Sequence, residues 1–300
     1  MAQTMTILAG ATGDLGGRIA KCLLERNAAL RLLVRKDSRR DPVDGFQKRG
    51  AEVIEVDFTS VPALADACAG GACVVSALAG LREVVVDAQT SLLAAAVKAQ
   101  VPRFIPSDYS IDFTKCADGH NRNLDLRREF HRKLAEAPLA ATSILNGGFT
   151  ELLAGPAPLI VRRIRRVVYW ENADQLLDFT TKDNTAEFTA AAALDASTPR
   201  FLRIAGDQIS AKSLVDVVSD LGGRRFKLLR AGSLRRLTFL IRVLRKLRPQ
   251  EAALYPVWQG MQYFHDMFSG CAKLAPLDNA RYPDIRWTTV RQFLACHSPG

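Results

Sequence analysis

The sequence predicts an α/β protein with a doubly wound parallel sheet, and two observations support this prediction. Short apolar runs alternate with amphipathic segments between residues 5 and 145, at spacings typical of strands joined by crossover helices. A glycine-rich turn, Gly10 to Gly17, lies between the first apolar run and the first amphipathic segment. The chain has 300 residues and is 48% hydrophobic, so it can bury one large core or two closely joined ones.

The glycine-rich turn has the spacing of a dinucleotide-binding site of the Rossmann type. Gly10 permits the tight turn, Gly13 lets backbone N–H groups approach a pyrophosphate, and Gly16 lets the next helix lie close to the strand. The N-terminus of that helix favours an anion, so we expect a dinucleotide here rather than an ordinary strand-to-helix turn. The predicted pyrophosphate contacts are Gly10, Thr12, Gly13, Asp14, Leu15 and Gly16.

The second predicted strand, residues 30–34, is followed by Arg35, at the position that distinguishes NAD from NADP. A carboxylate there would bind the ribose 2′-hydroxyl of NAD and repel a 2′-phosphate. Arg35 instead offers a planar cationic fork, with Lys36, Arg39 and Arg40 close behind. We therefore predict NADP(H) as the cofactor, and the alternative is that these side chains are solvated loop charges.

The remaining elements continue the alternation of strands and helices. We expect strands at 51–56, 72–76, 102–106 and 140–145, and helices at 61–69, 84–99 and 124–137. In a doubly wound sheet, ligands bind outside the carboxyl ends of the strands. The candidate contacts there are Asp57 and Phe58 beside the adenine, Ala77 and Leu78 beside the ribose or nicotinamide, Ser107, and Asn146 with Gly147. Asp57 could equally be only a turn residue.

The second half of the chain offers fewer signals. Asp183 or Asn184 is expected to cap a helix that ends at Leu194, and Ser210 a helix at 212–221. An aromatic-rich segment at 255–268 is mostly expected in the core, although some of its rings could line an apolar pocket.

The net charge of +10 raises the question of anionic partners. Basic residues concentrate at 162–166 and 235–248, and the second run is interleaved with leucines in the pattern of an amphipathic helix. A solvated helix face is the favoured interpretation, and contact with a membrane surface or a nucleic acid is the alternative. Nucleic acid is disfavoured because no known nucleic-acid module accompanies the charge. A homodimer remains open.

Composition also bears on metals, redox state and localisation. The six cysteines form no C-x-x-C pair and the four histidines lack ligand spacing, so we expect free thiols and assign no metal. No apolar run is long enough to cross a bilayer, and the first residues lack a signal-peptide pattern. A cytoplasmic protein is expected.

Taken together, several motifs resemble one known family. They are Gly10–Gly16, Arg35, Phe104–Tyr109, Asn146–Phe149, Leu177–Asp183, Phe201–Gly206 and Pro276–Pro283. The chain resembles the NmrA-like and isoflavone-reductase-like branch of the atypical short-chain dehydrogenases. The resemblance implies an NADP(H)-binding Rossmann domain at residues 1–150 and a smaller mixed substrate domain at 151–300, although some later segments could return to the first sheet.

The resemblance also implies two possible functions. One is an NADPH-dependent reductase that transfers hydride to a C=O, C=C or benzylic ether of a small hydrophobic, aromatic substrate. The other is an NADP(H)-sensing regulator without turnover.

The catalytic position departs from the family pattern. The reductases of this branch carry a lysine where ungapped counting from Asn146 places Arg127, and arginine is a poor proton donor and acceptor. We predict that Arg127 stabilises negative charge on the substrate while water, Ser107 or Tyr109 supplies a proton. The alternative is that Arg127 pairs with acidic neighbours on a solvated helix. Lys115 and Lys133 are further candidates without positional support.

Overall fold

The computed structural model describes residues 4–37, 40–155 and 159–297, and of Arg40 the backbone alone. The predicted 2′-phosphate contact Arg39 lies outside these residues. The chain forms two compact units, each built from separate segments. The first unit comprises residues 1–109, 126–144 and 185–202, and the second comprises 110–125, 145–184 and 203–300.

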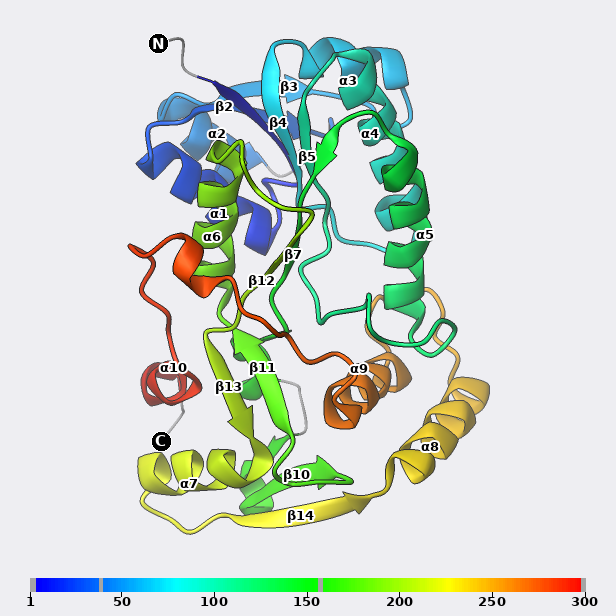
Figure 1. The fold of residues 1–300 in the computed structure, drawn as a ribbon, viewed down its shortest axis with the longest axis vertical. Helices are drawn as coiled ribbons and strands as arrows, with labels where there is room; N and C mark the ends of the chain where they lie inside the picture. Colours follow the sequence, from blue (N-terminus) through cyan, green and yellow to red (C-terminus); the bar gives the residue numbers. More distant parts are fainter. Residues whose placement is uncertain (1–3, 38–39, 156–158, 298–300) are drawn as a thin grey trace. The chain divides into compact units, whose positions relative to one another are not determined.

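The first unit contains a six-stranded sheet in the order β3-β2-β1-β4-β5-β6, in which all neighbouring strands are parallel (Figure 1). Its strands are β1 (Met5–Ala9), β2 (Ala29–Val34), β3 (Glu52–Glu55), β4 (Gly71–Ser76), β5 (Arg103–Ile105) and β6 (Ala140–Ala141). The chain starts in the middle of the sheet and winds first to one edge and then to the other. The predicted doubly wound parallel fold is therefore confirmed.

Helices cover both faces of this sheet, with α3, α4 and α5 on one face and α1, α2 and α6 on the other (Figure 1). Their bounds are α1 (Asp14–Glu25), α2 (Arg40–Lys48), α3 (Val61–Cys68), η1 (Glu83–Ala88), α4 (Gln89–Lys98), α5 (Arg122–Glu136) and α6 (Lys182–Leu194). The helix predicted at 84–99 thus begins as the π-helical segment η1. Buried apolar side chains such as Leu64, Leu92 and Phe130 fill the space beneath α3, α4 and α5.

The predicted sixth strand, 140–145, is two strands in the structure. Residues 140–141 pair with β5, and the Thr142 amide still donates to the Phe104 carbonyl at 3.0 Å. The next amide, of Ser143, donates to the Arg200 carbonyl at 2.9 Å instead. Strand β7 (Ser143–Leu145) therefore pairs with β12 (Phe201–Arg203), and the prediction of one continuous strand was wrong because the backbone changes partner at Thr142.

Residues 185–202 belong to the first unit, and the buried side chain of Arg103 binds them to its sheet. Arg103, on β5, donates to the carbonyls of Ala192 and Ala193 and to the Thr198 hydroxyl at 2.8–3.0 Å. Since each of these groups accepts a hydrogen bond from the guanidinium, the buried charge is well solvated by the protein. The end of α6 is thereby fastened to the sheet.

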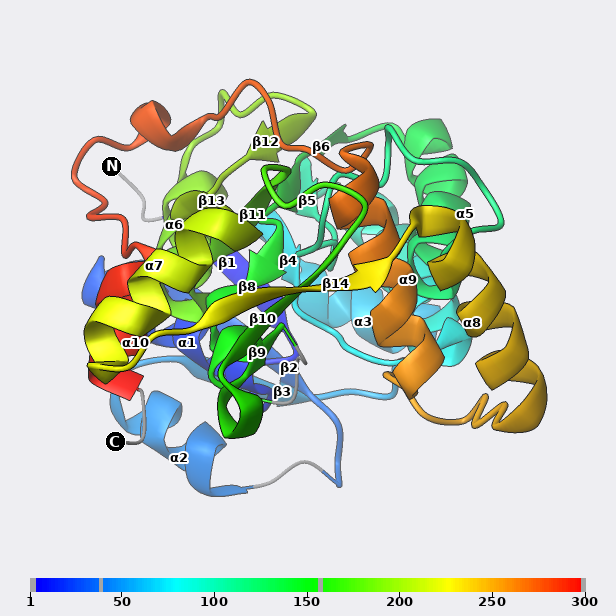
Figure 2. The ribbon, with the colours of Figure 1, turned by 90° about the horizontal axis from the view of Figure 1, so that it is seen from below.

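The second unit contains two small mixed sheets, in the orders β14-β10-β9 and β13-β11-β8. Their strands are β8 (Gly148–Phe149), β9 (Ile160–Val161), β10 (Arg166–Trp170), β11 (Leu176–Thr180), β13 (Asp207–Ser210) and β14 (Lys227–Gly232). The helical segments are η2 (Thr150–Leu153), η3 (Arg162–Ile164), α7 (Ala211–Gly222), α8 (Leu234–Leu247), α9 (Val257–Ser269), η4 (Asn279–Arg281) and α10 (Val290–His297). Strand β14 runs from α7 to α8, and α8 packs along α9 (Figure 2).

Two cap predictions have different outcomes. The Ser210 hydroxyl accepts from the Ser213 amide at 3.1 Å, which confirms the predicted cap of α7. Helix α6 begins earlier than predicted, and the Thr181 hydroxyl accepts from the Asn184 amide at 3.1 Å. Asp183 and Asn184 therefore lie inside the first turn instead of capping it. In the described part of the chain, every helix is too short or too polar to cross a bilayer.

Candidate functional site

The glycine-rich turn brings the end of β1 and the start of α1 into backbone contact. Gly10 has a φ of +94°, a conformation that side chains disfavour, and its carbonyl accepts from the Gly13 amide at 3.0 Å. A Cβ on Gly16 would lie 2.1 Å from that carbonyl oxygen. Gly13 is the N-cap of α1 and has no side chain that could satisfy the first N–H groups of the helix. The turn is therefore shaped to leave the helix N-terminus accessible to an anion.

The other residues predicted at the turn surround this N-terminus. Asp14 is exposed and accepts from Arg18 Nε at 2.8 Å, while Thr12 and Leu15 are half-buried. A Cβ on Gly10 would lie 2.6 Å from the Ala77 carbonyl oxygen, so the turn also contacts the loop after β4. Contacts this close require glycine at both Gly10 and Gly16.

Cationic residues follow β2, next to the turn in the sheet. Arg35 is exposed and lies 3.5 Å from Asp37, with Lys36 beside it. Asp57, at the end of the adjacent β3, accepts from the Thr59 amide and hydroxyl at 2.9 and 2.8 Å. These hydrogen bonds, the backbone one foremost, and the nearby Lys36 lower the pKa of Asp57. Asp57 is therefore a turn residue, as the alternative interpretation allowed, and its contact with the adenine stays a prediction.

Phe58, Ala77 and Leu78 lie at the same rim. Phe58 and Leu78 pack against the core beneath α3 and α4, and the Ala77 amide donates to the Ala9 carbonyl at 2.8 Å. The Leu78 carbonyl accepts from the Ser107 hydroxyl at 2.7 Å. Because that hydroxyl proton is directed at a backbone carbonyl, Ser107 is oriented as an acceptor rather than as a proton donor.

Tyr109 is held in the core. Its φ is +25°, and burial raises the pKa of its phenol well above the ordinary value, against the opposing effect of nearby Thr189. A buried phenol with a raised pKa gives up its proton reluctantly. The geometry therefore offers little support for the predicted role of Tyr109 as proton donor.

Arg127 lies on α5 and reaches the loop that follows β5. Its Nε donates to the Asp108 carbonyl at 2.8 Å, and the residue is half-buried. Of the acidic neighbours considered as its partners, Asp125 accepts from the Gly119 amide and Glu129 pairs with Arg82, and an ion pair with Arg127 stays the alternative. Arg127 thus lies at the carboxyl end of β5, the end of the sheet that carries the predicted site residues of the first unit.

A buried network that the sequence interpretation missed adjoins Arg127. His131 follows one turn later on α5, and its Nε2 lies 2.8 Å from Asp108 Oδ2. Its Nδ1 lies 3.0 Å from an Arg200 nitrogen, which can only donate, so His131 carries its proton on Nε2 and donates it to Asp108. Arg200 also donates to the Ser143 hydroxyl at 2.9 Å.

Asp108 is the acceptor at the centre of this network. Burial alone would raise the pKa of its carboxyl, but His131, Arg127 and Ser143 outweigh that effect and hold the pKa below its ordinary value. The spacing of Arg127 and His131, four residues apart on one helix face, was the available sequence signal.

Asn146 and Gly147 belong to the second unit. Gly147 has a φ of +70°, and a Cβ there would lie 2.4 Å from the Asp178 carbonyl oxygen. The Asn146 side chain is fully buried, and neither its amide nitrogen nor its oxygen has a hydrogen-bond partner among the described residues. A buried amide group without hydrogen-bond partners is suited to bind a polar atom of a ligand.

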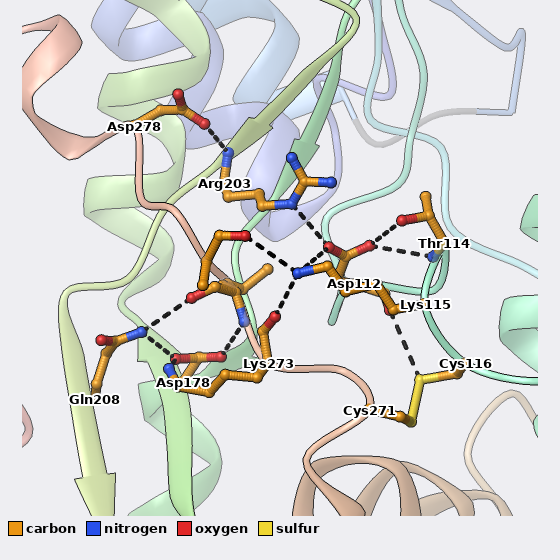
Figure 3. Close-up of polar contacts among 12 residues, drawn as sticks. Asp112, Thr114, Lys115, Cys116, Asp178, Arg203, Gln208, Cys271, Lys273 and Asp278 are labelled. Carbon is orange, nitrogen blue, oxygen red and sulfur yellow. Dashed lines mark hydrogen bonds and ion pairs between the residues drawn. A yellow bond between two sulfur atoms is a disulfide. The ribbon is translucent and has the colours of Figure 1, made fainter.

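A second polar cluster links distant segments of the second unit (Figure 3). Asp112 accepts from Thr114 and from Arg203 Nε at 2.8 Å and forms an ion pair with Lys115, and these contacts outweigh burial and lower its pKa. Lys115 also donates to the Lys273 and Ala275 carbonyls at 2.9 and 3.2 Å. Lys115 is therefore a structural crosslink, which explains its position without a catalytic role.

The same cluster contains an unexpected covalent link. Cys116 and Cys271 form a disulfide with a Cα–Cα distance of 5.4 Å, so the prediction of six free thiols was wrong for these two (Figure 3). Asp266 lies beside the two sulfurs, but their thiolates are consumed in the bond. Among the free cysteines, burial raises the pKa of Cys68 and of Cys73 to about 11, so both thiols are unreactive at neutral pH.

The aromatic-rich segment of the second unit is largely core. Trp258 and Phe268 are almost completely buried, and the Trp170 ring lies 5.7–5.8 Å from the rings of Phe264 and Phe268. Tyr255, in contrast, is exposed. These rings stabilise the second unit by burial, as the sequence interpretation favoured.

The sheet order and the glycine turn define a Rossmann-type fold. A family model describes the chain more narrowly, since residues 1–234 match the NmrA-like family. The chain therefore belongs to the NmrA-like family, which confirms the resemblance found in the sequence. No curated protein sequence matches the chain.

Solved structures of reductases share the fold over nearly the whole chain. AtPrR2 with NADP+ and (+)-pinoresinol superposes with a TM-score of 0.84 at 19% identity, covering 99% of both chains. An isoflavone reductase gives 0.83 at 18% identity, covering 98% of this chain and 99% of its own. The leucoanthocyanidin reductase–NADPH complex from Vitis vinifera gives 0.80 at 15% identity, with the same coverage.

Proposed function

We propose that the protein is an NADPH-dependent reductase of a small hydrophobic, aromatic substrate. The observation that carries this proposal is the turn at Gly10–Gly16. A Cβ on Gly16 or on Gly10 would lie only 2.1 or 2.6 Å from a backbone oxygen, so no other residue fits at either position. An ordinary strand-to-helix turn has no need of such contact. The three reductases named above share this fold, and two of them were solved with NADP+ or NADPH.

The residues of the turn fit the cofactor. The N-terminus of α1 would hold the pyrophosphate, and Arg35 with Lys36 would hold the 2′-phosphate through charge-assisted hydrogen bonds. Asn146, with its orphaned amide, and Gly147 are proposed to line the nicotinamide end. Bound NADPH supplies a hydride.

Arg127 is the proposed catalytic residue. Its guanidinium stabilises the negative charge that develops on a substrate oxygen, and removal of such a donor costs on the order of 3 kcal/mol, or about a hundredfold in rate. Asp108 is a positioning group, because its carbonyl accepts from Arg127 Nε at 2.8 Å. Since Ser107 donates to Leu78 and Tyr109 is buried, water supplies the proton.

A regulator that binds NADP(H) without turnover is the second candidate. The specific observation in its favour is that neither Ser107 nor Tyr109 presents a proton to solvent, and an arginine replaces the family lysine at 127. Such a protein would bind the cofactor as tightly as a reductase does. The difference lies in turnover alone.

Two measurements separate these candidates. Fluorescence titration with NADPH and NADH tests the cofactor, and we expect a clear preference for NADPH that Arg35→Ala abolishes. Oxidation of NADPH is then followed across quinones, enones, aromatic aldehydes and benzylic ethers. Turnover that Arg127→Met reduces about a hundredfold, with cofactor affinity retained, supports the reductase. NADPH binding without any turnover, together with a protein partner recovered in only one cofactor state, supports the regulator.

A further inference from the structure

Helix α8 of the second unit carries more apolar surface than its packing uses. Leu237 and Ile241 are buried and face the rest of the unit, as an amphipathic helix requires. Phe239 and Leu247, however, are 65% and 72% exposed, and Leu240 is 43% exposed. The buried side of this amphipathic helix thus contains only some of its apolar residues, and the others are exposed to solvent.

The exposed residues form two neighbouring rows along the outer face. Helical periodicity aligns Arg235, Phe239, Arg242 and Lys246 in one row, and Arg236, Leu240 and Leu247 in the row beside it. All seven side chains are exposed. Residues 234–248 contain six basic residues and no acidic one. We call the face formed by these two rows the α8 outer face.

The charges of this face are not neutralised locally. Arg245, on another side of α8, lies 3.3 Å from Glu251 and over the Trp258 ring. Among the described residues, no ion pair involves Arg235, Arg242 or Lys246. Exposed apolar groups continue past the helix, since Tyr255 before α9 and Val257 at its start are 65% and 70% exposed. The surface therefore combines unneutralised positive charge with protruding apolar side chains.

We propose that the α8 outer face docks on the surface of an anionic phospholipid bilayer. The basic side chains complement lipid phosphates, and Phe239, Leu240 and Leu247 enter the boundary between headgroups and acyl chains. A 14-residue helix is about 21 Å long, which is too short to span a hydrocarbon core of about 30 Å, so α8 lies in the plane of the interface.

Two other occupants suit this face less well. A nucleic acid would use the cations but has no place for a row of exposed aliphatic side chains, because phosphate contacts are polar. A second copy of the chain, paired face to face, would bring two clusters of arginine together, and like charges across an interface are unfavourable. An anionic bilayer satisfies the charges and the apolar groups together.

The test is flotation of the full-length protein with vesicles of phosphatidylcholine alone and with 30 mol% phosphatidylglycerol. We expect binding only to the anionic vesicles, weakened by salt. Arg235→Gln/Arg242→Gln/Lys246→Gln should reduce binding about a hundredfold, since each basic residue near the surface contributes about a factor of five. Phe239→Ser/Leu247→Ser should reduce it by about tenfold or more. The matched controls, Lys48→Gln/Lys98→Gln/Arg132→Gln and Leu152→Ser, alter exposed residues elsewhere and should bind normally.

Other results overturn the proposal. Absence of wild-type binding to the anionic vesicles would do so, as would equal losses in the controls and the α8 variants. Binding to a DNA duplex that needs the charges but is indifferent to Phe239 and Leu247 would assign the face to nucleic acid. Dimerisation in sedimentation that Phe239→Ser/Leu247→Ser abolishes, without vesicle binding, would assign it to a second copy. NADPH titration of each variant checks folding and does not depend on turnover.

Discussion

Substitution of Gly16 by alanine gives the sharpest test of the site, because the adjacent Gly17 provides a control in the same helix. A Cβ at 16 would lie 2.1 Å from the Gly10 carbonyl oxygen, whereas a Cβ at 17 would lie 3.3 Å from the Ala11 oxygen. Both changes gain about 1 kcal/mol of helix propensity, so the difference between them isolates the steric overlap. To relieve that overlap, α1 must move by roughly 1 Å relative to the turn.

The size of the effect follows from this displacement. Overpacking of a tight contact costs about 1–3 kcal/mol, so Gly16→Ala should unfold roughly 2–10 °C below Gly17→Ala. A shift of roughly 1 Å also breaks N–H contacts to a bound pyrophosphate. Each hydrogen bond to a charged group contributes about 1.5–3 kcal/mol, so NADPH affinity should fall by about tenfold to a hundredfold or more.

Thermal unfolding by circular dichroism and NADPH titration by fluorescence measure the two effects separately. Gly17→Ala should bind NADPH like the wild-type protein. If Gly16→Ala also binds NADPH with wild-type affinity, the turn is not the pyrophosphate site and the proposed function loses its main support. If both variants lose affinity equally, the overlap at 16 is not the cause.

Four further predictions follow from the same structure. Arg35→Ala should weaken NADPH binding by about tenfold to a hundredfold and leave NADH binding unchanged, as titration with both cofactors will show. Arg127→Lys should retain part of the turnover that Arg127→Met loses, because charge matters more than fork geometry at an oxyanion. Reduction of the Cys116–Cys271 disulfide should lower the free energy of unfolding by about 2–5 kcal/mol and raise the number of titratable thiols from four to six. Asp108→Asn should destabilise the protein by about 1.5–3 kcal/mol at pH 7, because a neutral amide replaces the buried carboxylate that accepts from His131. The pKa of Asp108 is lowered in the folded protein, so its contribution to the free energy of unfolding is complete above the ordinary pKa of 3.8 and is lost as the pH falls through the lower pKa of the folded state. Urea unfolding at a series of pH values will detect this loss.

The first unit was largely predictable because most of its strands and helices have a local sequence signal, although helix α2 was not predicted. Strand β1, the glycine turn and α1 occur where apolar periodicity and glycine spacing place them. The break at Thr142 had no such signal, since it depends on pairing with residues near Arg200, almost sixty positions later. Tertiary pairing decides where such a strand changes partner.

The polar networks were less predictable for a related reason. The disulfide joins cysteines 155 positions apart, and only the fold brings Cys116 and Cys271 together. His131 looked like a scattered histidine because Asp108, its acceptor, comes from the loop after β5, 23 positions earlier. A disulfide or a polar network formed by two distant segments can be recognised only when the fold shows which residues lie close together.

The geometry of the proton sources narrows the substrate class of the proposed reductase. A benzylic ether needs a proton on its leaving oxygen as the bond breaks, and a general acid near that oxygen would have to supply it. Ser107 directs its proton to Leu78, and burial raises the pKa of Tyr109. Quinones and enones instead form oxyanions or enolates that Arg127 can stabilise until water protonates them. Within the proposed function, these electron-poor acceptors are therefore favoured over ethers.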